Sequence, residues 1–231
     1  MNIDYLQVGN GRLGSLIANR VKKHLKGDIR FARIDPVRGL ILPTNTRSQI
    51  KINRLVICIS PSVRNPWCWR DLLFGLSAQV VNGEIEIGQL LMISSTRVYD
   101  GIERGIVTAE TQPVAVSEKA EALLEAENTI RSLAKYHHIF RPSGLYGKSY
   151  QKYSQILKLS DSNKPFRFGV DEQQVADQVM LRIQQETSVC SIALLTDSCG
   201  YYKGQKKSFE QIEKYSVQGR VLKNSVIEYQ A

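Results

Sequence analysis

The sequence predicts an α/β fold built on a doubly wound parallel sheet, and three observations lead to that class. An apolar run, Ile3–Val8, meets glycines at positions 9, 11 and 14, and an amphipathic helical pattern follows at once. Further apolar runs then alternate with helical patterns of crossover length along most of the chain. Small and polar residues follow several of these runs, where a parallel sheet gathers the carboxyl ends of its strands and binds ligands.

The glycine spacing G-x-G-x-x-G predicts a turn that binds a dinucleotide. Gly9 permits a tight strand-to-helix turn, Gly11 leaves room for a pyrophosphate, and Gly14 lets the helix pack closely on its strand. The N–H groups at the helix start, together with the helix dipole, hold phosphates. The alternative is a glycine-rich turn that binds nothing. The candidate cofactor-binding residues here are Gly9, Asn10, Gly11, Arg12, Leu13 and Gly14.

The second strand, expected over Asp28–Ile34, ends where the adenosine ribose of a dinucleotide would lie. Asp35 has the spacing of an acidic residue that bonds the ribose 2′-hydroxyl and favours NAD. Arg33 and Arg38 instead favour the 2′-phosphate of NADP. The two signals oppose each other, so the predicted cofactor is NAD or NADP.

The other elements are expected in the following order. Helices are predicted over Arg12–Leu25, Trp69–Val81, Ser117–Tyr136, Tyr150–Leu159, Val170–Gln185 and Ser208–Tyr215. Further strands are predicted over Arg54–Ser60, Gln89–Ser95 and Ser191–Thr196, with another that ends in Arg141–Gly144, while Leu40–Lys51 is a short strand or a loop. The strand ends add Ser60, Pro61 and Ser94 to the candidate cofactor-binding residues.

Length and composition indicate one soluble domain over residues 1–231. The chain is 42% hydrophobic and 23% charged, without an apolar run long enough to cross a bilayer. Its start runs directly into the first strand, which leaves no room for a signal peptide. The four cysteines lack metal or disulfide spacing, which favours a reducing, cytoplasmic setting. We expect no metal site, because the adjacent His137 and His138 have no carboxylate partner.

The chain is basic, with a net charge of +9 and a pI near 9.4. These charges are spread along the sequence, and no basic block or known nucleic-acid-binding motif is present. We therefore do not expect a nucleic-acid partner. A basic surface can instead steer an anionic cofactor or a phosphorylated substrate toward its site.

Four ordered segments resemble the extended short-chain dehydrogenase/reductase family, which includes nucleotide-sugar epimerases and dehydratases. Leu91–Gly101 resembles the family's strand ending in S-S-T-x-V-Y-G, and Phe140–Gly147 resembles its R-P-x-x-x-Y-G strand. Phe168–Val179 and Gly219–Ser225 are similar to its V-H-V-x-D-V-A and G-K-x-x-x-N segments. The resemblance implies a Rossmann-type fold in which residues 148–231 supply a reduced substrate-binding portion. It also implies a small-molecule substrate, phosphorylated or nucleotide-linked, and places Arg141 and Pro142 near the cofactor.

The resemblance also assigns catalytic positions, and one of them is altered. In the family, a Tyr and a Lys at Y-x-x-x-K spacing share one helical face, and a strand-end Ser bonds the same substrate oxygen. Ser95 matches the Ser, and Lys119 matches the Lys that binds the nicotinamide ribose. The Tyr position is Ala115, whose methyl group carries no proton. Tyr99 and Tyr146 are alternative proton carriers, with simple packing as their other interpretation.

Three explanations of the missing Tyr stay open. The chain resembles an atypical branch of the family that binds NAD(P) without the Tyr, or another group transfers the proton. In the third, the cofactor is only a ligand, as in redox sensors that contact a partner protein. The predicted function is therefore an NAD(P)-dependent oxidoreductase or epimerase-like enzyme with altered proton chemistry. The alternative is a non-catalytic NAD(P)-binding regulator, and the resemblance leaves a homodimer open.

Overall fold

The glycine turn leaves the end of a strand that lies inside a large central sheet. The computed structural model describes residues 1–25, 29–35, 39–42, 49–59, 68–148, 166–185, 189–202, 205–214, 216 and 219–230. Within these residues the central sheet has the order β15-β11-β7-β5-β4-β1-β2-β3. Its strands are β1 (Asn2–Val8), β2 (Ile29–Asp35), β3 (Gly39–Ile41), β4 (Ile50–Ile57), β5 (Ile85–Ile93), β7 (Tyr136–Pro142), β11 (Val189–Leu195) and β15 (Ser225–Gln230).

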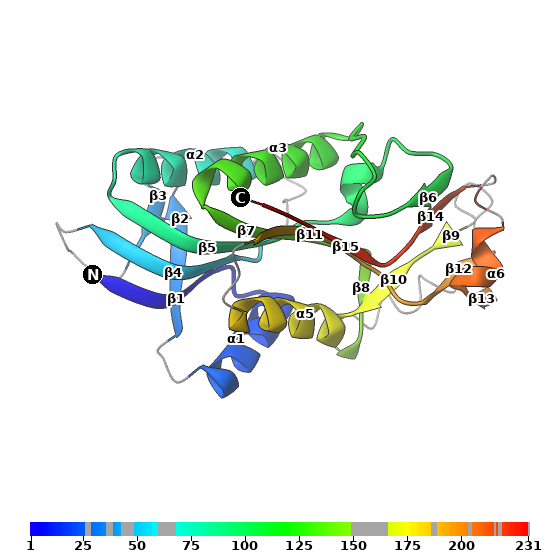
Figure 1. Ribbon diagram of the computed structural model, residues 1–231, viewed down its shortest axis with the longest axis horizontal. Coiled ribbons are helices and arrows are strands. Elements are labelled where there is room, and N and C mark those ends of the chain that lie inside the picture. Colours follow the sequence, from blue (N-terminus) through cyan, green and yellow to red (C-terminus); the bar gives the residue numbers. More distant parts are fainter. Residues whose placement is uncertain are drawn as a thin grey trace.

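Helices cover both faces of this sheet, as the doubly wound prediction requires. Figure 1 shows α2 and α3 on one face and α1 and α5 on the other. The helices are α1 (Arg12–His24), α2 (Cys68–Val81), α3 (Glu118–Leu133), α5 (Glu172–Gln184) and α6 (Phe209–Glu213), with a 3-10 turn, η1, over Thr96–Tyr99. The predicted α/β class is therefore confirmed, and the fold is of the Rossmann type. Among the described residues, no helix is long and apolar enough to cross a membrane.

Smaller sheets lie beyond the carboxyl ends of the parallel strands, at one end of the molecule (Figure 1). They pair β8 with β10, β6 with β14, and β12 with both β9 and β13. Their strands are β6 (Gly105–Val107), β8 (Gly144–Tyr146), β9 (Phe166–Arg167), β10 (Gly169–Asp171), β12 (Cys199–Tyr202), β13 (Gln205–Ser208) and β14 (Arg220–Leu222). Residues after 148 also supply α5, β11 and β15, so this part of the chain completes the central sheet as well.

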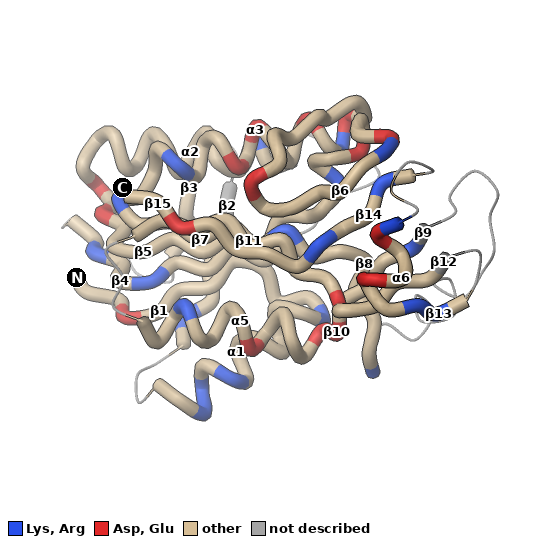
Figure 2. Tube along the Cα trace, turned by 45° about the vertical axis from the view of Figure 1, so that its right-hand side comes forward, with Lys and Arg blue, Asp and Glu red and all other residues tan. Residues whose placement is uncertain are grey.

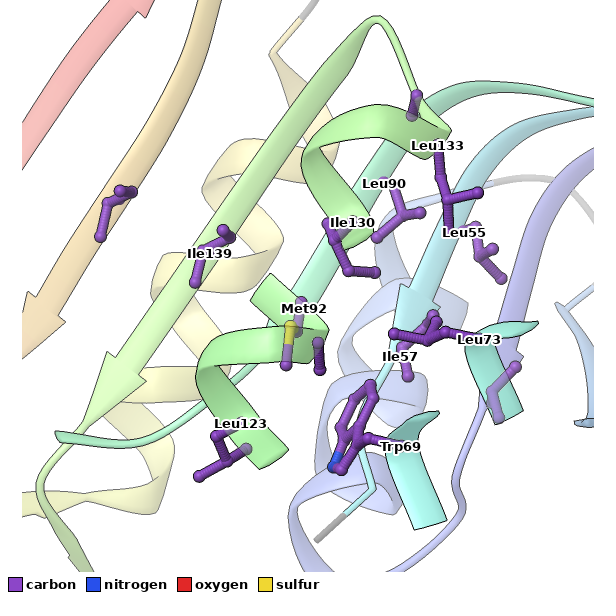
Figure 3. Packing of buried hydrophobic residues seen from close by; sticks show 14 of the residues in the cluster. Leu55, Ile57, Trp69, Leu73, Leu90, Met92, Leu123, Ile130, Leu133 and Ile139 are labelled. Atoms are coloured by element: carbon purple, nitrogen blue, oxygen red, sulfur yellow. The ribbon is translucent and has the colours of Figure 1, made fainter. Parts of the chain in front are cut away.

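The apolar periodicity explains the two packed layers. On α1, Leu13, Ile17 and Val21 are buried at helical spacing and pack with the inward side chains of α5. On the other face, α2 and α3 bury a separate cluster against the sheet, and Trp69 is fully buried there. Figure 3 shows Trp69 and Leu73 beside Ile57, with the α3 side chains next to them.

Strand pairing gathers the carboxyl ends of five parallel strands at one edge of the sheet, on either side of the turn. β1 pairs in parallel with β2 and β4, β4 pairs in parallel with β5, and β5 pairs in parallel with β7. The carboxyl ends of these strands therefore point the same way, toward the smaller sheets. This is the edge where open α/β sheets bind ligands.

The two edge strands depart from the sequence prediction. β3 turns back on β2 as an antiparallel neighbour, with Arg33 opposite Ile41, so no crossover helix separates these two strands. At the other edge, β15 comes from the tail for which no element was predicted, and it pairs antiparallel with β11. Antiparallel strands need only a short connection, whereas parallel ones need a crossover.

Some predictions fall elsewhere or outside the described residues. The helix predicted over Ser117–Tyr136 ends earlier, at Leu133, so His137 and His138 lie within β7, where both are buried. The helix predicted over Tyr150–Leu159 and the site residues Ser60 and Pro61 lie outside the described residues, as does Arg38.

Candidate functional site

A cleft of about 650 Å³ opens at the carboxyl ends of β1, β4, β5 and β7. A volume of this size suits a small-molecule or cofactor site. The cleft brings together many of the residues predicted from the sequence, which are Gly9, Gly11, Arg12, Leu13, Gly14, Ser94, Ser95, Lys119 and Pro142. It also includes residues that the sequence analysis did not single out, which are Cys58, Ile59, Ile93, Arg97, Leu123, Ser143, Gly144 and Leu145.

The first and last glycines of the turn are required by the protein's own packing. Gly9 has a φ of +95°, and a Cβ atom there would lie 2.1 Å from the carbonyl oxygen of Cys58. A Cβ atom on Gly14 would lie 2.3 Å from the carbonyl oxygen of Gly9. Real Cβ contacts are never so short, so glycine at these two positions lets β1, β4 and α1 approach one another.

The middle glycine is different, because no contact among the described residues requires it. A Cβ atom on Gly11 would meet none of their atoms within 4 Å, and its φ of −73° is open to any residue. Gly11 also stands at the N-cap of α1, where a Ser or Asp would normally satisfy an N–H group. A glycine with free space around it at a helix start fits a bulky ligand that must approach the backbone closely.

The turn is fixed by a buried amide. Gln7 is fully buried, and its Nε2 donates to the carbonyl oxygens of Gly9 at 2.8 Å and Gly14 at 2.9 Å. The hydroxyl of Tyr5 donates to Gln7 Oε1 at 2.6 Å. Gln7 therefore ties the end of β1 to the first turn of α1, and Tyr5 holds the Gln7 amide in place. Gln7 is a polar residue within an otherwise apolar run, and this is the signal by which the sequence could have identified it.

The electrostatics of the cleft favour an anion. The first turn of α1 contains no acidic residue, and no side chain caps its N-terminus. Among the described residues that line the cleft, Arg12, Arg97 and Lys119 are basic and none is acidic. The helix dipole adds positive potential at the same place. The described lining is therefore a phosphate-binding environment.

Behind the cleft wall, a buried ion pair ties β5, α3 and β7 together. Arg141 and Glu127 are 1% and 0% exposed, and their closest N–O distance is 2.5 Å. Ser94, which lines the cleft, donates its hydroxyl to Glu127 Oε1 at 2.5 Å. Arg141 was predicted to bind the cofactor, but its guanidinium lies in this buried network and does not line the cleft. Glu127 follows Leu123 at helical spacing on the buried side of α3, which is the signal that would have found it.

Tyr99 belongs to the same network and does not reach the cleft. Its side chain is fully buried, its hydroxyl donates to the carbonyl oxygen of Thr108 at 3.1 Å, and Arg141 donates to that hydroxyl. Burial raises the pKa of Tyr99, with the Arg141 charge acting in the opposite sense. Because Tyr99 is buried and its hydroxyl is engaged in two hydrogen bonds within the protein, its role is structural. It is not placed to transfer a proton to a ligand in the cleft.

Tyr146, the other tyrosine considered, also lies away from the described lining. Its hydroxyl donates to Asp197 Oδ2 at 2.5 Å. Burial and the neighbouring Asp197 carboxylate raise the pKa of Tyr146, so deprotonation is disfavoured. The preceding residue, Leu145, lines the cleft, and successive side chains of a strand point to opposite faces. The pattern therefore directs Tyr146 away from the cleft.

Ser95 and Lys119 both line the cleft, but Ala115 is not on the helix that contains Lys119. Ser117 is the N-cap of α3, and its hydroxyl accepts from the N–H of Ala120 at 3.3 Å. Lys119 is thus in the first helical turn, whereas Ala115 lies in the segment before the cap. Positions 115 and 119 therefore do not share one helical face, as the Tyr and Lys of the resembled family do. A Tyr at position 115 would not lie one helical turn before Lys119.

The residues predicted to contact the adenosine end are spread out. Asn10 lines a separate hollow between α1 and β2, where the Ser15 hydroxyl donates to its Oδ1 at 2.9 Å. Arg33 is exposed on β2 and is not part of the described cleft lining. The side chain of Asp35 lies outside the described part of the chain. The opposing NAD and NADP signals therefore stay open.

No metal cluster appears among the described residues, and the one cysteine of the described cleft lining is protonated. No group of three His, Cys, Asp or Glu side chains there could hold a metal ion. Cys58 lines the cleft, but burial raises its pKa to about 12, so the thiol is protonated at neutral pH. The potential proton donors in the described lining are therefore Lys119 and the serine hydroxyls, besides this thiol.

Comparisons with known proteins support the fold. No protein-family model matches the chain, and no curated protein does. A protein of Methylobacillus flagellatus, provisionally named an NAD-dependent epimerase/dehydratase, is 19% identical with a TM-score of 0.65, covering 96% of this chain and 89% of its own. MoeE5 in complex with UDP-glucuronic acid and NAD is 15% identical with a TM-score of 0.63, covering 96% and 86%.

A third similar structure is UDP-glucuronic acid 4-epimerase from Bacillus cereus in complex with UDP-glucuronic acid and NAD. It is 16% identical with a TM-score of 0.61, covering 96% of this chain and 85% of its own. At these identities the likeness shows a shared fold. The chain therefore has the architecture of NAD-dependent epimerases and dehydratases over nearly its whole length.

Proposed function

We propose that this protein binds NAD or NADP in the described cleft, with the pyrophosphate at the N-terminus of α1. The observation that carries the proposal is Gly11, where an added Cβ atom would meet no atom of the described residues within 4 Å. The cationic lining and the absence of an acidic residue in the first turn of α1 support the same ligand. The similar structures that contain NAD add the analogy of a shared fold.

The residues of the cleft suggest how the two halves of the cofactor would be held. The N–H groups of the α1 start and the Arg12 side chain would contact the phosphates. Ser94, Ser95 and Lys119, at the ends of β5 and α3, would lie near the nicotinamide half. A bound nicotinamide supplies hydride transfer. Residues 148–231 would supply the reduced substrate-binding portion.

The chemistry proposed for this cleft is that of an oxidoreductase or sugar-nucleotide enzyme with altered proton transfer. Lys119 and Ser95 are the groups that would donate hydrogen bonds to a substrate oxygen, because no Tyr, His, Asp or Glu is in the described lining. The substrate class that we propose is a nucleotide-linked sugar, because the names of two similar structures include UDP-glucuronic acid. Cytoplasmic location and a homodimer remain predictions.

A second candidate function is a non-catalytic dinucleotide-binding regulator. One specific observation favours it: Ala115 both lacks a proton-carrying group and precedes the N-cap of α3, so the acid/base position is lost in chemistry and in placement. In this case the protein would bind the cofactor and contact a partner protein without turning the cofactor over.

The proposal is tested by titrating the purified full chain with NADH and with NADPH and recording the fluorescence of the bound nicotinamide. Saturable binding of either cofactor is expected. No binding of either would contradict both candidate functions. Consumption of the bound NAD(P)H in the presence of a 4-keto nucleotide sugar would then favour the enzyme, and its persistence would favour the regulator.

A further inference from the structure

We propose that Arg97 forms an oxyanion subsite at the Ser95 end of the cleft, and that the substrate carries a carboxylate or phosphate group there. This inference rests on the dinucleotide function proposed above and adds a property of the substrate to it. Arg97 is not one of the positions matched to the family's catalytic residues.

The backbone of Arg97 is held in place by the turn that follows β5. Ser95 is the N-cap of η1, and its hydroxyl accepts from the N–H of Arg97 at 3.2 Å. The N–H of Asp100 donates to the carbonyl oxygen of Arg97 at 2.9 Å. The Arg97 side chain is exposed and lines the cleft, so a fixed backbone presents a movable guanidinium to the ligand space.

The subsite is separate from the phosphate-binding turn. The turn follows β1 and Arg97 follows β5, and β4 lies between these two strands. Neighbouring strands are about 4.8 Å apart, so the two strand ends are roughly 10 Å apart across the sheet. Arg97 is therefore placed to contact what lies beside the nicotinamide half.

The charge on Arg97 has no counterion in the described part of the protein. No hydrogen bond or ion pair of its side chain is found with the described residues, and no acidic residue lines the cleft there. The nearby carboxylates are already engaged. Asp100 accepts from the N–H of Val116 at 2.8 Å and from the Ser117 hydroxyl, and Glu127 is bound by Arg141 and Ser94.

A guanidinium of this kind recognises planar or tetrahedral oxyanions. Its N–H groups form a fork that matches two oxygens of a carboxylate or phosphate at once. A neutral hydroxymethyl group would gain little from it, because the exposed guanidinium keeps its hydration. Lys119, in the same lining, adds positive charge. The cleft should therefore prefer the anionic member of a pair of otherwise identical sugars.

The experiment compares UDP-glucuronic acid with UDP-glucose, which differ at C6 by a carboxylate in place of a hydroxymethyl group. Each is titrated by calorimetry into the full chain saturated with whichever nicotinamide cofactor binds. The wild type should bind UDP-glucuronic acid about tenfold more tightly, because only the carboxylate gains charge-assisted hydrogen bonds from the guanidinium. Glucose 6-phosphate, compared with glucose, asks whether a phosphate serves as well as a carboxylate.

Two variants make the test specific. Arg97→Gln should remove the preference for the anionic sugar, so that UDP-glucuronic acid binds no more tightly than UDP-glucose. Arg104→Gln, at an exposed position outside the described lining, should keep the preference. Equal affinities in the wild type, a preference that survives Arg97→Gln, or no binding of any anionic sugar would overturn the inference. Failure of the proposed function is a different result, because NADH and NADPH would then not bind at all.

Discussion

The carbonyl oxygen of Gly9 lies 2.3 Å from the point that a Cβ atom on Gly14 would occupy. The strand-to-helix turn therefore leaves no room for a side chain at Gly14, and the same closeness brings the start of α1 to the cleft. A substitution at Gly14 tests this packing.

Gly14→Ala should destabilise the protein by about 1–3 kcal/mol, because the new methyl group meets a backbone oxygen that cannot move aside. Urea unfolding followed by circular dichroism measures the change. Gly11→Ala serves as the comparison, since the methyl group there meets no protein atom within 4 Å. Equal losses at the two positions would contradict the packing described for this turn.

Gln7→Leu should also loosen the turn, because it removes hydrogen bonds, whereas Gly14→Ala introduces a steric clash. The substitution leaves the carbonyl oxygens of Gly9 and Gly14 without their amide donor, and the Tyr5 hydroxyl without its acceptor. Each unsatisfied buried group costs about 1–3 kcal/mol. We expect a lower midpoint of urea unfolding together with weaker NAD(P)H binding.

Tyr5→Phe is the matched control, because it removes a single hydrogen bond to Gln7 and leaves both bonds to the turn in place. Its cofactor affinity should stay close to that of the wild type. If Gln7→Leu binds cofactor as tightly as Tyr5→Phe does, Gln7 does not hold the turn in its binding shape.

Glu127→Gln should cost about 3–5 kcal/mol of stability, because it leaves the Arg141 charge buried without a counterion. The double substitution Glu127→Leu with Arg141→Met removes both charges and should recover most of this loss. Unfolding free energies of the wild type and both variants give the comparison. A double variant no more stable than Glu127→Gln would show that the network contributes more than paired charges.

Acid should destabilise the protein through its buried histidines. Burial, followed by the nearby Arg182 charge, lowers the pKa of His138 to about 4, below an ordinary value near 6.5. The unfolded chain therefore binds the proton more readily between pH 6.5 and pH 4, so stability is full above this range and is lost as pH falls through it. Urea unfolding at pH 7 and pH 5 should differ by about 2 kcal/mol from this residue.

His138→Gln should flatten that pH dependence, whereas His24→Gln, at an exposed position on α1, should leave it unchanged. Burial also lowers the pKa of His137, whose Nε2 lies 2.8 Å from the Tyr229 hydroxyl, so part of the slope should persist in the first variant. A wild type equally stable at both pH values would rule out neutral buried histidines in β7.

The sequence was most informative where local patterns decide the structure. Apolar runs and helical periodicity predicted β1, α1, α2, β5, α3 and α5 to within a few residues. Glycine spacing predicted the turn, since Gly14 packs against the carbonyl oxygen of Gly9 within the same strand-turn-helix unit. The predicted helix start at Ser117 matches the N-cap of α3, again because capping is a local interaction.

Features set by distant contacts escaped prediction. The reversal of β3 onto β2 and the pairing of β15 with β11 depend on partners elsewhere in the chain. Strand-end motifs located Arg141 and Tyr99, but not the direction of their side chains, which the buried Glu127 determines. The motif S-S-T-x-V-Y-G accepts any residue at the position of Arg97, so it did not indicate Arg97 as a site residue. The turn after β5 places Arg97 at the cleft.

The proposed dinucleotide site depends most directly on the space at Gly11, which we assign to a pyrophosphate. Gly11→Ser places a side chain there and supplies a good N-cap, so the melting temperature should stay level or rise. Titrated with NADH or NADPH beside the wild type, this variant should lose at least tenfold in cofactor affinity. Undiminished affinity in a stable Gly11→Ser protein would contradict the dinucleotide site.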